Sequence, residues 1–247
     1  MGKAFYRVSY YTLGAALRAA FRIRMNGREH IPKTGPGIIA SNHFSYADHF
    51  LTPAKVPRQI FYISKAQHFD HKVQGWLFKQ WGVIPLKRGA GDQGAFNQAL
   101  EILREGNLFG IFPEGTRSTD GKVHKGHTGV IRMALMTGAP IIPVGMTNSD
   151  VILPKNKSWP KFKKCVINVG EPWDLSQYKG RENDRELCRA LTDELMRKIA
   201  ALAGREYVDD YTPVADYQKK SGTPQAPPAT PAAPEGAVPS LKEARVR

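Results

Sequence analysis

Short apolar runs alternate with segments of helical periodicity along most of this chain, and this alternation is the feature that most constrains its fold. Strands are expected near residues 37–40, 59–64, 83–86, 108–112, 140–144 and 165–169. Helices are expected near residues 47–52, 73–81, 92–104 and 128–137. Strands separated by helices favour a largely parallel sheet that is covered on both faces. We therefore predict an α/β fold with a single, largely parallel central sheet flanked by helices.

Two of the expected helices carry additional signals. Asp92 is predicted to be the N-cap of the helix at residues 92–104, and Gly106 lies just past its end. A further helix at about residues 184–203 has aliphatic side chains at helical spacing, which indicates a stripe that packs on the core. The residues of this stripe are Leu187, Leu191, Leu195, Ile199 and Leu202.

Length and composition fit one folded domain with appendages. The chain has 247 residues, of which 41% are hydrophobic, enough to bury a core. We expect the domain to span residues 25–210. From about Tyr211 the chain is rich in Pro and Ala and almost free of aliphatic residues, which predicts a disordered tail over residues 211–247.

The first 24 residues form a separate segment in which aromatic and aliphatic residues mix with cations. The run from Val8 to Leu17 contains ten uncharged residues, short of the roughly 18 that a membrane-spanning helix needs. We predict an amphipathic helix over residues 1–24 that lies in the interface of an anionic membrane. The alternative is a helix that packs on its own domain. A cleaved signal peptide is disfavoured, because no clear small-residue cleavage site follows the apolar stretch.

Asn42, His43 and Asp48 form the first candidate site. Two residues that are five apart diverge within one helix, so His43 is expected in the loop before the helix at 47–52, with Asp48 reaching back to it. Asp48 would then accept the N–H of one imidazole nitrogen and leave the other nitrogen free to take a proton. With no serine or cysteine nucleophile nearby, such a pair can activate the hydroxyl of a bound substrate. The alternative is a histidine that merely stabilises a turn.

Three further blocks join apolar runs to glycines, prolines or cations. Residues 82–88 read Gly-Val-Ile-Pro-Leu-Lys-Arg, residues 110–118 read Gly-Ile-Phe-Pro-Glu-Gly-Thr-Arg-Ser, and residues 139–144 read Ala-Pro-Ile-Ile-Pro-Val. The second block can present backbone N–H groups and an arginine fork to a phosphate. Polar residues follow four of the predicted strands, at the sheet edge where α/β proteins bind ligands, so we expect them to converge on one crevice. These residues are His43, Lys65, Arg88 and Glu114.

These blocks, in this order, resemble the glycerophospholipid acyltransferase family, and specifically bacterial 1-acylglycerol-3-phosphate acyltransferases. The four matching blocks are His-x4-Asp at residues 43–48, Gly-x-Ile-x3-Arg at residues 82–88, Phe-Pro-Glu-Gly-Thr-Arg-Ser at residues 112–118 and the proline-flanked residues 140–143. The resemblance covers about residues 25–205. It implies an α/β catalytic domain with a membrane-associated N-terminal element, a catalytic first block, and second and third blocks that bind glycerol phosphate.

The resemblance implies a role for each candidate residue. His43 would deprotonate the acceptor hydroxyl as it attacks an acyl thioester, and Asp48 would orient His43. Lys65 would stabilise the oxyanion, the alternative being a solvated surface lysine. Arg88 and Arg117 would clamp the acceptor phosphate, with Gly115 and Thr116 supplying the turn and further donors. Glu114 would hold Arg117 or an acceptor hydroxyl, or form a purely structural ion pair. The product would be phosphatidic acid, made in phospholipid biosynthesis.

A net charge of +14 and a pI near 9.8 indicate anionic partners. The expected partners are anionic membrane lipid, lysophosphatidate, and acyl-CoA or acyl carrier protein as donor. No nucleic acid is expected, because no helix-turn-helix, RNP motif or zinc module is recognisable. We predict a peripheral or monotopic protein on the cytoplasmic face of the cell membrane.

Several alternatives remain open at this stage. Lys87 differs from the acidic or polar residue expected before Arg88, which leaves room for another lysolipid or a polyol as acceptor. A His/Asp hydrolase of thioesters or lipids, or a basic nucleic-acid-binding protein, would belong to a different class. The two cysteines, Cys165 and Cys188, lack metal-ligand spacing and are expected to be buried thiols. We therefore expect neither a metal nor a cofactor other than the acyl donor.

Overall fold

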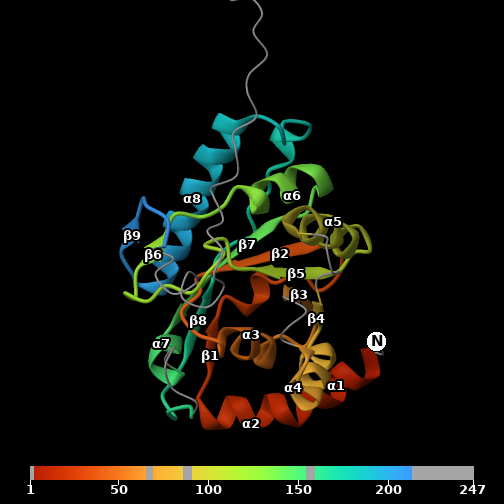
Figure 1. The fold of residues 1–247 in the computed structure, drawn as a ribbon, viewed down its shortest axis with the longest axis vertical. Helices are drawn as coiled ribbons and strands as arrows, with labels where there is room; N and C mark the ends of the chain where they lie inside the picture. The colour runs from red at the N-terminus through yellow and green to blue at the C-terminus, as the bar shows by residue number, and fades with distance from the viewer. Residues whose placement is uncertain (1–2, 65–68, 86–90, 154–158, 213–247) are drawn as a thin grey trace, which may run out of the picture. The chain divides into compact units, whose positions relative to one another are not determined.

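A computed structural model describes residues 3–64, 69–85, 91–153 and 159–212 of the chain. Most of the tail predicted at residues 211–247 lies outside these residues. The domain is built around one sheet with helices on both faces (Figure 1). The α/β prediction is therefore confirmed.

The sheet contains seven strands among the described residues, in the order β1-β8-β7-β2-β5-β3-β4. Every pairing is parallel except that of β7 with β8. The sheet is thus largely parallel, as predicted, with one antiparallel step toward the β1 edge. Its strands are β1 (Arg24–Asn26), β2 (Gly37–Ser41), β3 (Ile60–Ser64), β4 (Val83–Pro85), β5 (Leu108–Ile111), β7 (Ile141–Thr147) and β8 (Val166–Val169).

Helices α5 (Gly91–Arg104), α6 (Gly129–Thr137) and α8 (Arg185–Ala203) cover one face of the sheet. Their apolar side chains share a core cluster with Ile38 and Ala40 of β2. Ile39, between these two residues, points to the opposite face, because successive side chains of a strand alternate. There it packs with residues of the helical segment before β1 and of the helical segment after β2. One strand therefore supports both layers.

The opposite face is covered by shorter elements. They are α2 (Leu13–Ala20), α3 (Asp48–Leu51), the 3₁₀ helix η2 (Pro53–Lys55), α4 (Lys72–Gln80) and α7 (Ser149–Ile152). Phe21, Leu51 and Ala54 join Ile39 in the second core cluster. The remaining short elements are η1 (Arg28–His30), η4 (Ser176–Tyr178) and a separate parallel pair, β6 (Val123–His124) with β9 (Tyr207–Val208).

The N-terminal segment is helical, but it is two helices rather than the one predicted. Helix α1 (Lys3–Tyr11) ends before Thr12, where the backbone leaves helical geometry at φ −95° and ψ −83°, and α2 follows. The break places one side of each helix on the domain. Tyr6 donates a hydrogen bond to the carbonyl oxygen of Val56 at 2.9 Å, and Arg18 donates to that of Ala54 at 2.7 Å. Among the described residues, no helix is long and apolar enough to cross a membrane.

Of the predictions about helix ends, one requires correction. Helix α5 begins at Gly91, so Asp92 lies in its first turn and is not the N-cap. Gly106 does follow the helix end, with a positive φ of 76° that suits a residue without a side chain. Asp184 is the N-cap of α8, where its side chain accepts the N–H of Leu187 at 3.0 Å. The helix expected at residues 184–203 is confirmed at Arg185–Ala203.

Candidate active site

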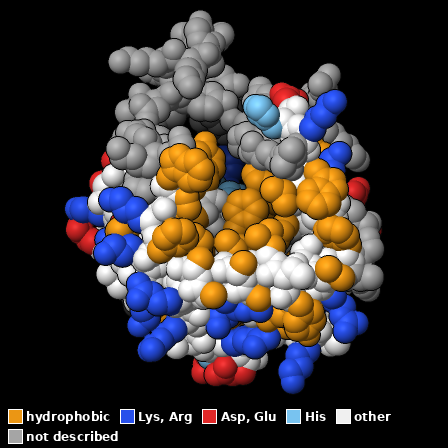
Figure 2. Space-filling view, turned by 90° about the horizontal axis from the view of Figure 1, so that it is seen from below, with side chains coloured by type: hydrophobic (Ala, Val, Ile, Leu, Met, Phe, Trp, Pro, Cys, Tyr) orange, Lys and Arg blue, Asp and Glu red, His pale blue; other side chains and the backbone are white. Residues whose placement is uncertain are grey.

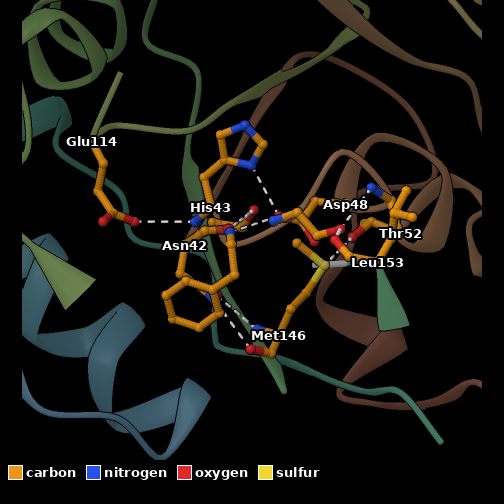
Figure 3. A network of polar contacts seen from close by, with 11 residues as sticks. Asn42, His43, Asp48, Thr52, Glu114, Met146 and Leu153 are labelled. Atoms are coloured by element: carbon orange, nitrogen blue, oxygen red, sulfur yellow. Dashed lines mark hydrogen bonds and ion pairs between the residues drawn. The ribbon is translucent and has the colours of Figure 1, made fainter. Parts of the chain in front are cut away.

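His43 lies in the loop that leaves β2, and Asp48 is the first residue of α3. Their side chains meet, with His43 Nδ1 at 2.9 Å from Asp48 Oδ2 (Figure 3). A carboxylate can only accept this hydrogen bond, so Nδ1 carries the proton and Nε2 presents a lone pair. Nε2 has no hydrogen-bond partner among the described residues. The pair thus has the geometry of a base and the residue that orients it.

Asp48 is completely buried and fixes the loop as well as the imidazole. Its Oδ2 accepts the backbone N–H groups of Phe44 and Ser45, each at 2.9 Å, in addition to His43. One oxygen therefore holds three successive residues of the loop. Ser45 is itself held, since its hydroxyl donates to the carbonyl oxygen of Leu153 at 2.8 Å. The position of His43 is consequently set by its own loop rather than by exposed side chains.

Asn42 connects this loop to the neighbouring strand β7. Its side-chain oxygen accepts the N–H of Met146 at 2.7 Å, and its side-chain nitrogen donates to the Met146 carbonyl oxygen at 3.1 Å (Figure 3). The amide thus continues the sheet hydrogen bonding past the end of β2. Asn42 is fully buried, so neither of these groups could turn to water instead.

Aromatic rings surround the imidazole. The ring of Phe112 stacks on that of His43, with 4.0 Å between centroids and 15° between planes. His49 lies edge-on to His43 at 5.4 Å. The histidine is only 9% exposed. A flat apolar ring against the imidazole limits its rotation and keeps one side of it away from water.

Glu114 follows β5 and reaches the backbone of His43. Its Oε1 accepts the His43 N–H at 3.1 Å, and its Oε2 accepts the His124 N–H at 3.2 Å. Burial raises the pKa of Glu114 to about 7, and the two N–H groups oppose that rise by stabilising the carboxylate. The sequence predicts that Glu114 holds Arg117 or an acceptor hydroxyl, or forms a purely structural ion pair. Instead both of its oxygens face main-chain donors, because the turn places Arg117 elsewhere.

Arg117 lies over the ring of Tyr46, with its guanidinium carbon 3.7 Å from the ring centroid. This distance is that of a cation–π contact. Its Nη1 is buried and makes no hydrogen bond with the described residues. The next residue, Ser118, donates its N–H to the His43 carbonyl oxygen at 2.8 Å, so Arg117 is carried beside the histidine. A guanidinium with a free, buried donor is suited to bind an anion.

The turn between Glu114 and Arg117 depends on Gly115. Its φ is +70°, and a side chain there would come within 3.0 Å of the His127 ring. The Gly115 N–H donates to the carbonyl oxygen of Phe112 at 3.0 Å. Thr116 is exposed at the tip of the turn. The glycine therefore lets the chain reverse tightly enough for Glu114 and Ser118 both to reach His43.

The structure brings together six of the eight residues predicted for the site: His43 and Asp48, and Glu114, Gly115, Thr116 and Arg117 of the turn. Lys65 and Arg88 lie outside the described residues, just after the ends of β3 and β4. Sequence reasoning missed Phe112, Tyr46 and His124. Phe112 read as the end of an apolar strand. Tyr46 and His124 carried no spacing signal, because their contacts join segments far apart in the sequence.

Other nucleophiles and metal sites are not evident in the part of the chain that the structure describes. Burial raises the pKa of the Cys165 thiol to about 12, and that of Cys188 also rises on burial, so neither thiol ionises readily. No cluster of three His, Cys, Asp or Glu side chains suited to a metal ion occurs among the described residues. The arrangement is best suited to proton abstraction from a substrate hydroxyl that lies next to an anion.

Comparisons with known proteins agree with this geometry. The family model described as Acyltransferase matches residues 22–147. The chain is 28% identical over 206 residues to the 1-acyl-sn-glycerol-3-phosphate acyltransferase of Borreliella burgdorferi, covering 79% of this chain and 81% of that protein. It is 31% identical over 137 residues to the chloroplastic 1-acyl-sn-glycerol-3-phosphate acyltransferase LPAT1 of Arabidopsis thaliana. That match covers 54% of this chain, and it spans only 38% of the plant protein's length.

A solved structure has the same fold. The crystal structure of the 1-acyl-sn-glycerophosphate acyltransferase PlsC from Thermotoga maritima superposes with a TM-score of 0.64 and 25% sequence identity. The match covers 79% of this chain and 81% of that chain. The resemblance therefore extends over nearly all of the described domain.

Proposed function

The chain belongs to the acyltransferase family, and we propose that it transfers a fatty acyl group from an acyl thioester to the free hydroxyl of 1-acylglycerol-3-phosphate, giving phosphatidic acid. The observation that carries this proposal is the 2.9 Å pair of His43 with Asp48, beside an arginine that has a free, buried donor. The pair supplies a base for the hydroxyl, and the arginine supplies a partner for the phosphate. Relatives with this name match the chain over most of its described domain.

The base is His43 through Nε2. It takes the proton of the acceptor hydroxyl while the oxygen attacks the thioester carbonyl carbon. The imidazolium that forms lies against the Asp48 carboxylate, which stabilises its positive charge. The proton then passes to the sulfur of the leaving thiolate, and no covalent bond to the protein forms.

The tetrahedral intermediate places negative charge on the former carbonyl oxygen, and catalysis requires donors directed at that oxygen. Lys65 remains our candidate for this role, because it follows β3 at the same sheet edge as His43. A backbone N–H would be its partner. Both assignments rest on the position of Lys65 in the sequence.

The acceptor phosphate is assigned to Arg117 and Arg88. Arg117 is held in place by the Tyr46 ring, so it can bind an anion without first losing the freedom of a mobile side chain. Gly115 forms the turn, and the exposed Thr116 beside Arg117 offers its N–H and hydroxyl as further donors. Arg88 follows β4, the edge strand next to β3.

The donor is an acyl thioester, either acyl-CoA or acyl carrier protein, and we propose no other cofactor. Both donors are acidic, and the net charge of +14 favours the binding of either. The same charge suits a membrane that contains anionic lipid. No nucleic acid is proposed as a partner.

We propose that the domain binds the membrane peripherally through the surface that α1 and α4 expose. Aromatic and aliphatic side chains gather there, and Lys and Arg side chains flank them (Figure 2). Phe5 packs edge-on to Trp76 with 5.6 Å between ring centroids, which joins the two helices. Such a surface matches the interface of an anionic bilayer, where the lysolipid acceptor resides. Its exposed apolar side chains are Phe5, Val8, Tyr11, Leu13 and Trp76.

The test is to incubate the purified chain with a labelled acyl thioester and a panel of lysolipids and glycerol phosphate, and to identify the products by mass. Acylated 1-acylglycerol-3-phosphate is expected. Free fatty acid formed equally well without any acceptor would indicate a hydrolase instead. Transfer to a different lysolipid would support the proposed acyl transfer and would replace 1-acylglycerol-3-phosphate as the proposed acceptor.

A further inference from the structure

A second exposed aromatic and basic segment lies away from α1, at residues 159–164. Trp159 is 86% exposed and Phe162 is 69% exposed, the two most exposed large apolar side chains of the described residues. Lys161, Lys163 and Lys164 are exposed in the same segment. Isolated apolar residues are common on protein surfaces, but a tryptophan and a phenylalanine among three lysines form a patch of mixed character. We call residues 159–164 the basic aromatic loop.

The backbone of the basic aromatic loop is anchored to the domain. The Lys161 N–H donates to the Ile152 carbonyl oxygen at 2.7 Å, and the Cys165 N–H donates to the Phe21 carbonyl oxygen at 3.0 Å. The Asn148 side chain donates to the Lys164 carbonyl oxygen at 3.0 Å. The main chain is therefore fixed at three points while the aromatic and lysine side chains project outward. A patch held in this way loses little conformational entropy when it binds.

The loop is continuous with the N-terminal helices. The ring of Phe162 stacks on that of Phe21 with 5.8 Å between centroids and 28° between planes. Phe21 directly follows α2, and α1 precedes α2 (Figure 1). An eight-residue helix is about 12 Å long, so the loop and the exposed side of α1 lie at opposite ends of α2.

The sequence is basic both around the basic aromatic loop and in the N-terminal helices. Residues 151–170 contain five lysines and no acidic residue, and residues 1–28 contain no acidic residue either. Arg22 and Arg24 are exposed next to Phe21. A membrane that carries anionic lipid attracts each such cation, whereas a neutral bilayer does not. The combination of exposed aromatic rings with unopposed cations therefore selects an anionic lipid surface over a purely apolar partner.

We propose that the basic aromatic loop is a second membrane contact, which docks Trp159 and Phe162 into an anionic bilayer at the same time as α1. This proposal rests on the proposed function in that it takes the acceptor to be in the membrane. Two separate membrane contacts restrict the orientation of the domain on the bilayer more than a single contact does. They fix how the sheet edge that carries His43 is turned toward the bilayer, so the acceptor can reach it without leaving the interface.

The experiment uses the full chain in flotation with vesicles of phosphatidylcholine, with and without phosphatidylglycerol. Trp159→Ala is the first variant, because this side chain makes no ring contact with the described residues and its loss should leave the fold intact. Lys163→Gln/Lys164→Gln is the second. Lys179→Gln/Arg185→Gln, two exposed cations near the start of α8, is the matched control.

We expect Lys163→Gln/Lys164→Gln to lower partitioning onto anionic vesicles roughly 30-fold, about five-fold for each cation lost. Trp159→Ala should lower it on both vesicle types by about ten-fold or more, in line with the apolar area that a tryptophan buries. The control should change it by less than about two-fold. Binding of both loop variants at the parental level would overturn the proposal.

Activity on a short-chain, soluble acceptor separates this proposal from the proposed function. Retained soluble turnover with reduced vesicle binding supports the second contact. Vesicle binding that falls in the loop variants, in a chain that shows no acyl transfer at all, would refute the proposed function and leave the membrane contact standing.

Discussion

The side-chain amide of Asn42 pairs with the main chain of Met146 in both directions, at 2.7 and 3.1 Å, although 104 residues separate them. Asn42→Asp keeps the shape and removes the donor, which turns a buried carboxylate toward the Met146 carbonyl oxygen. We expect a loss of about 3 kcal/mol in the free energy of unfolding, as for an unpaired buried charge. Urea unfolding measures it, and Asn97→Asp, at an exposed position on α5, is the matched control. Equal stability of the two variants would contradict the role of this pair.

His43→Ala should remove acyl transfer by about two to four orders of magnitude, since it removes the base. Asp48→Asn should cost nearly as much, because an amide permits the wrong tautomer of His43. The amide oxygen can still accept the main-chain N–H groups of Phe44 and Ser45, so the fold should survive. Asp120→Asn is the control, as Asp120 also pairs with a histidine, His124, at 3.0 Å. Steady-state kinetics and circular dichroism check both effects, and near-parental turnover of either site variant would make the His43–Asp48 pair structural.

Arg117→Ala should raise the KM for the phosphorylated acceptor by about ten-fold or more, the cost of a charge-assisted hydrogen bond. Arg117→Lys should have an intermediate effect, since it keeps the charge and loses the fork that stacks on Tyr46. The KM for the acyl thioester is measured in parallel and should change little. An equal rise for both substrates would place Arg117 outside the phosphate site.

Glu114 should make stability depend on pH. Its pKa is raised from 4.5 to about 7 in the folded chain, so the folded state binds more protons than the unfolded state between these values. Its contribution is therefore complete below about pH 4.5 and is lost as pH rises through 7. Over this window the parent should lose up to about 3 kcal/mol relative to Glu114→Gln. Urea unfolding of both proteins at pH 4.5, 6 and 8 measures this difference, and a constant difference would contradict the pKa of Glu114.

The surface of α1 can be tested without removing the helix. Tyr6 and Arg18 bind the domain, so a deletion of residues 2–22 would also destabilise the fold. Phe5→Ser/Val8→Ser/Tyr11→Ser changes only exposed side chains and should lower vesicle binding at least about 100-fold, given about 25 cal/mol per Å² of apolar area. Activity on vesicle-borne acceptor should fall more than on a soluble acceptor. Met136→Ser, on the far layer, is the control, and undiminished flotation of the triple variant would move the contact elsewhere.

The sheet could be predicted from sequence because each of its longer strands is a continuous apolar run with a helical pattern beside it. The six predicted strands match β2, β3, β4, β5, β7 and β8 to within a few residues. Strands β1, β6 and β9 were missed, since none of these two- or three-residue strands lies in a longer apolar run, whereas the equally short β4 is part of the apolar run Val83–Leu86. Their existence depends on partners that are distant in sequence.

In the candidate site, too, some features could be predicted from the sequence and others could not. His43, Asp48 and the turn at residues 114–117 stand out as residue types at close spacing. The contacts of Glu114 could not be predicted, because its partners are main-chain N–H groups, which every residue except proline has. Of the two tryptophans in the helix predicted at residues 73–81, Trp76 is 52% exposed, whereas Trp81, which follows the end of α4, is only 1% exposed. Helical periodicity alone could not assign which of the two faces outward.

The pair of β6 and β9 can form only late in translation, because β9 is synthesised long after the N-terminal helices. His124, whose N–H holds Glu114, lies on β6, and the flanking N–H groups of Val123 and Lys125 donate to the carbonyl oxygens of Glu206 and Asp210. The ribosome makes α1 and α2 first and these last acceptors nearly 190 residues after α2. A growing chain that bound the bilayer through its first helices would be on the membrane before the β6–β9 contacts that position His124 and Glu114 had formed. Arrival at the lipid and completion of the contacts that hold Glu114 are thus separated by the synthesis of nearly 190 residues.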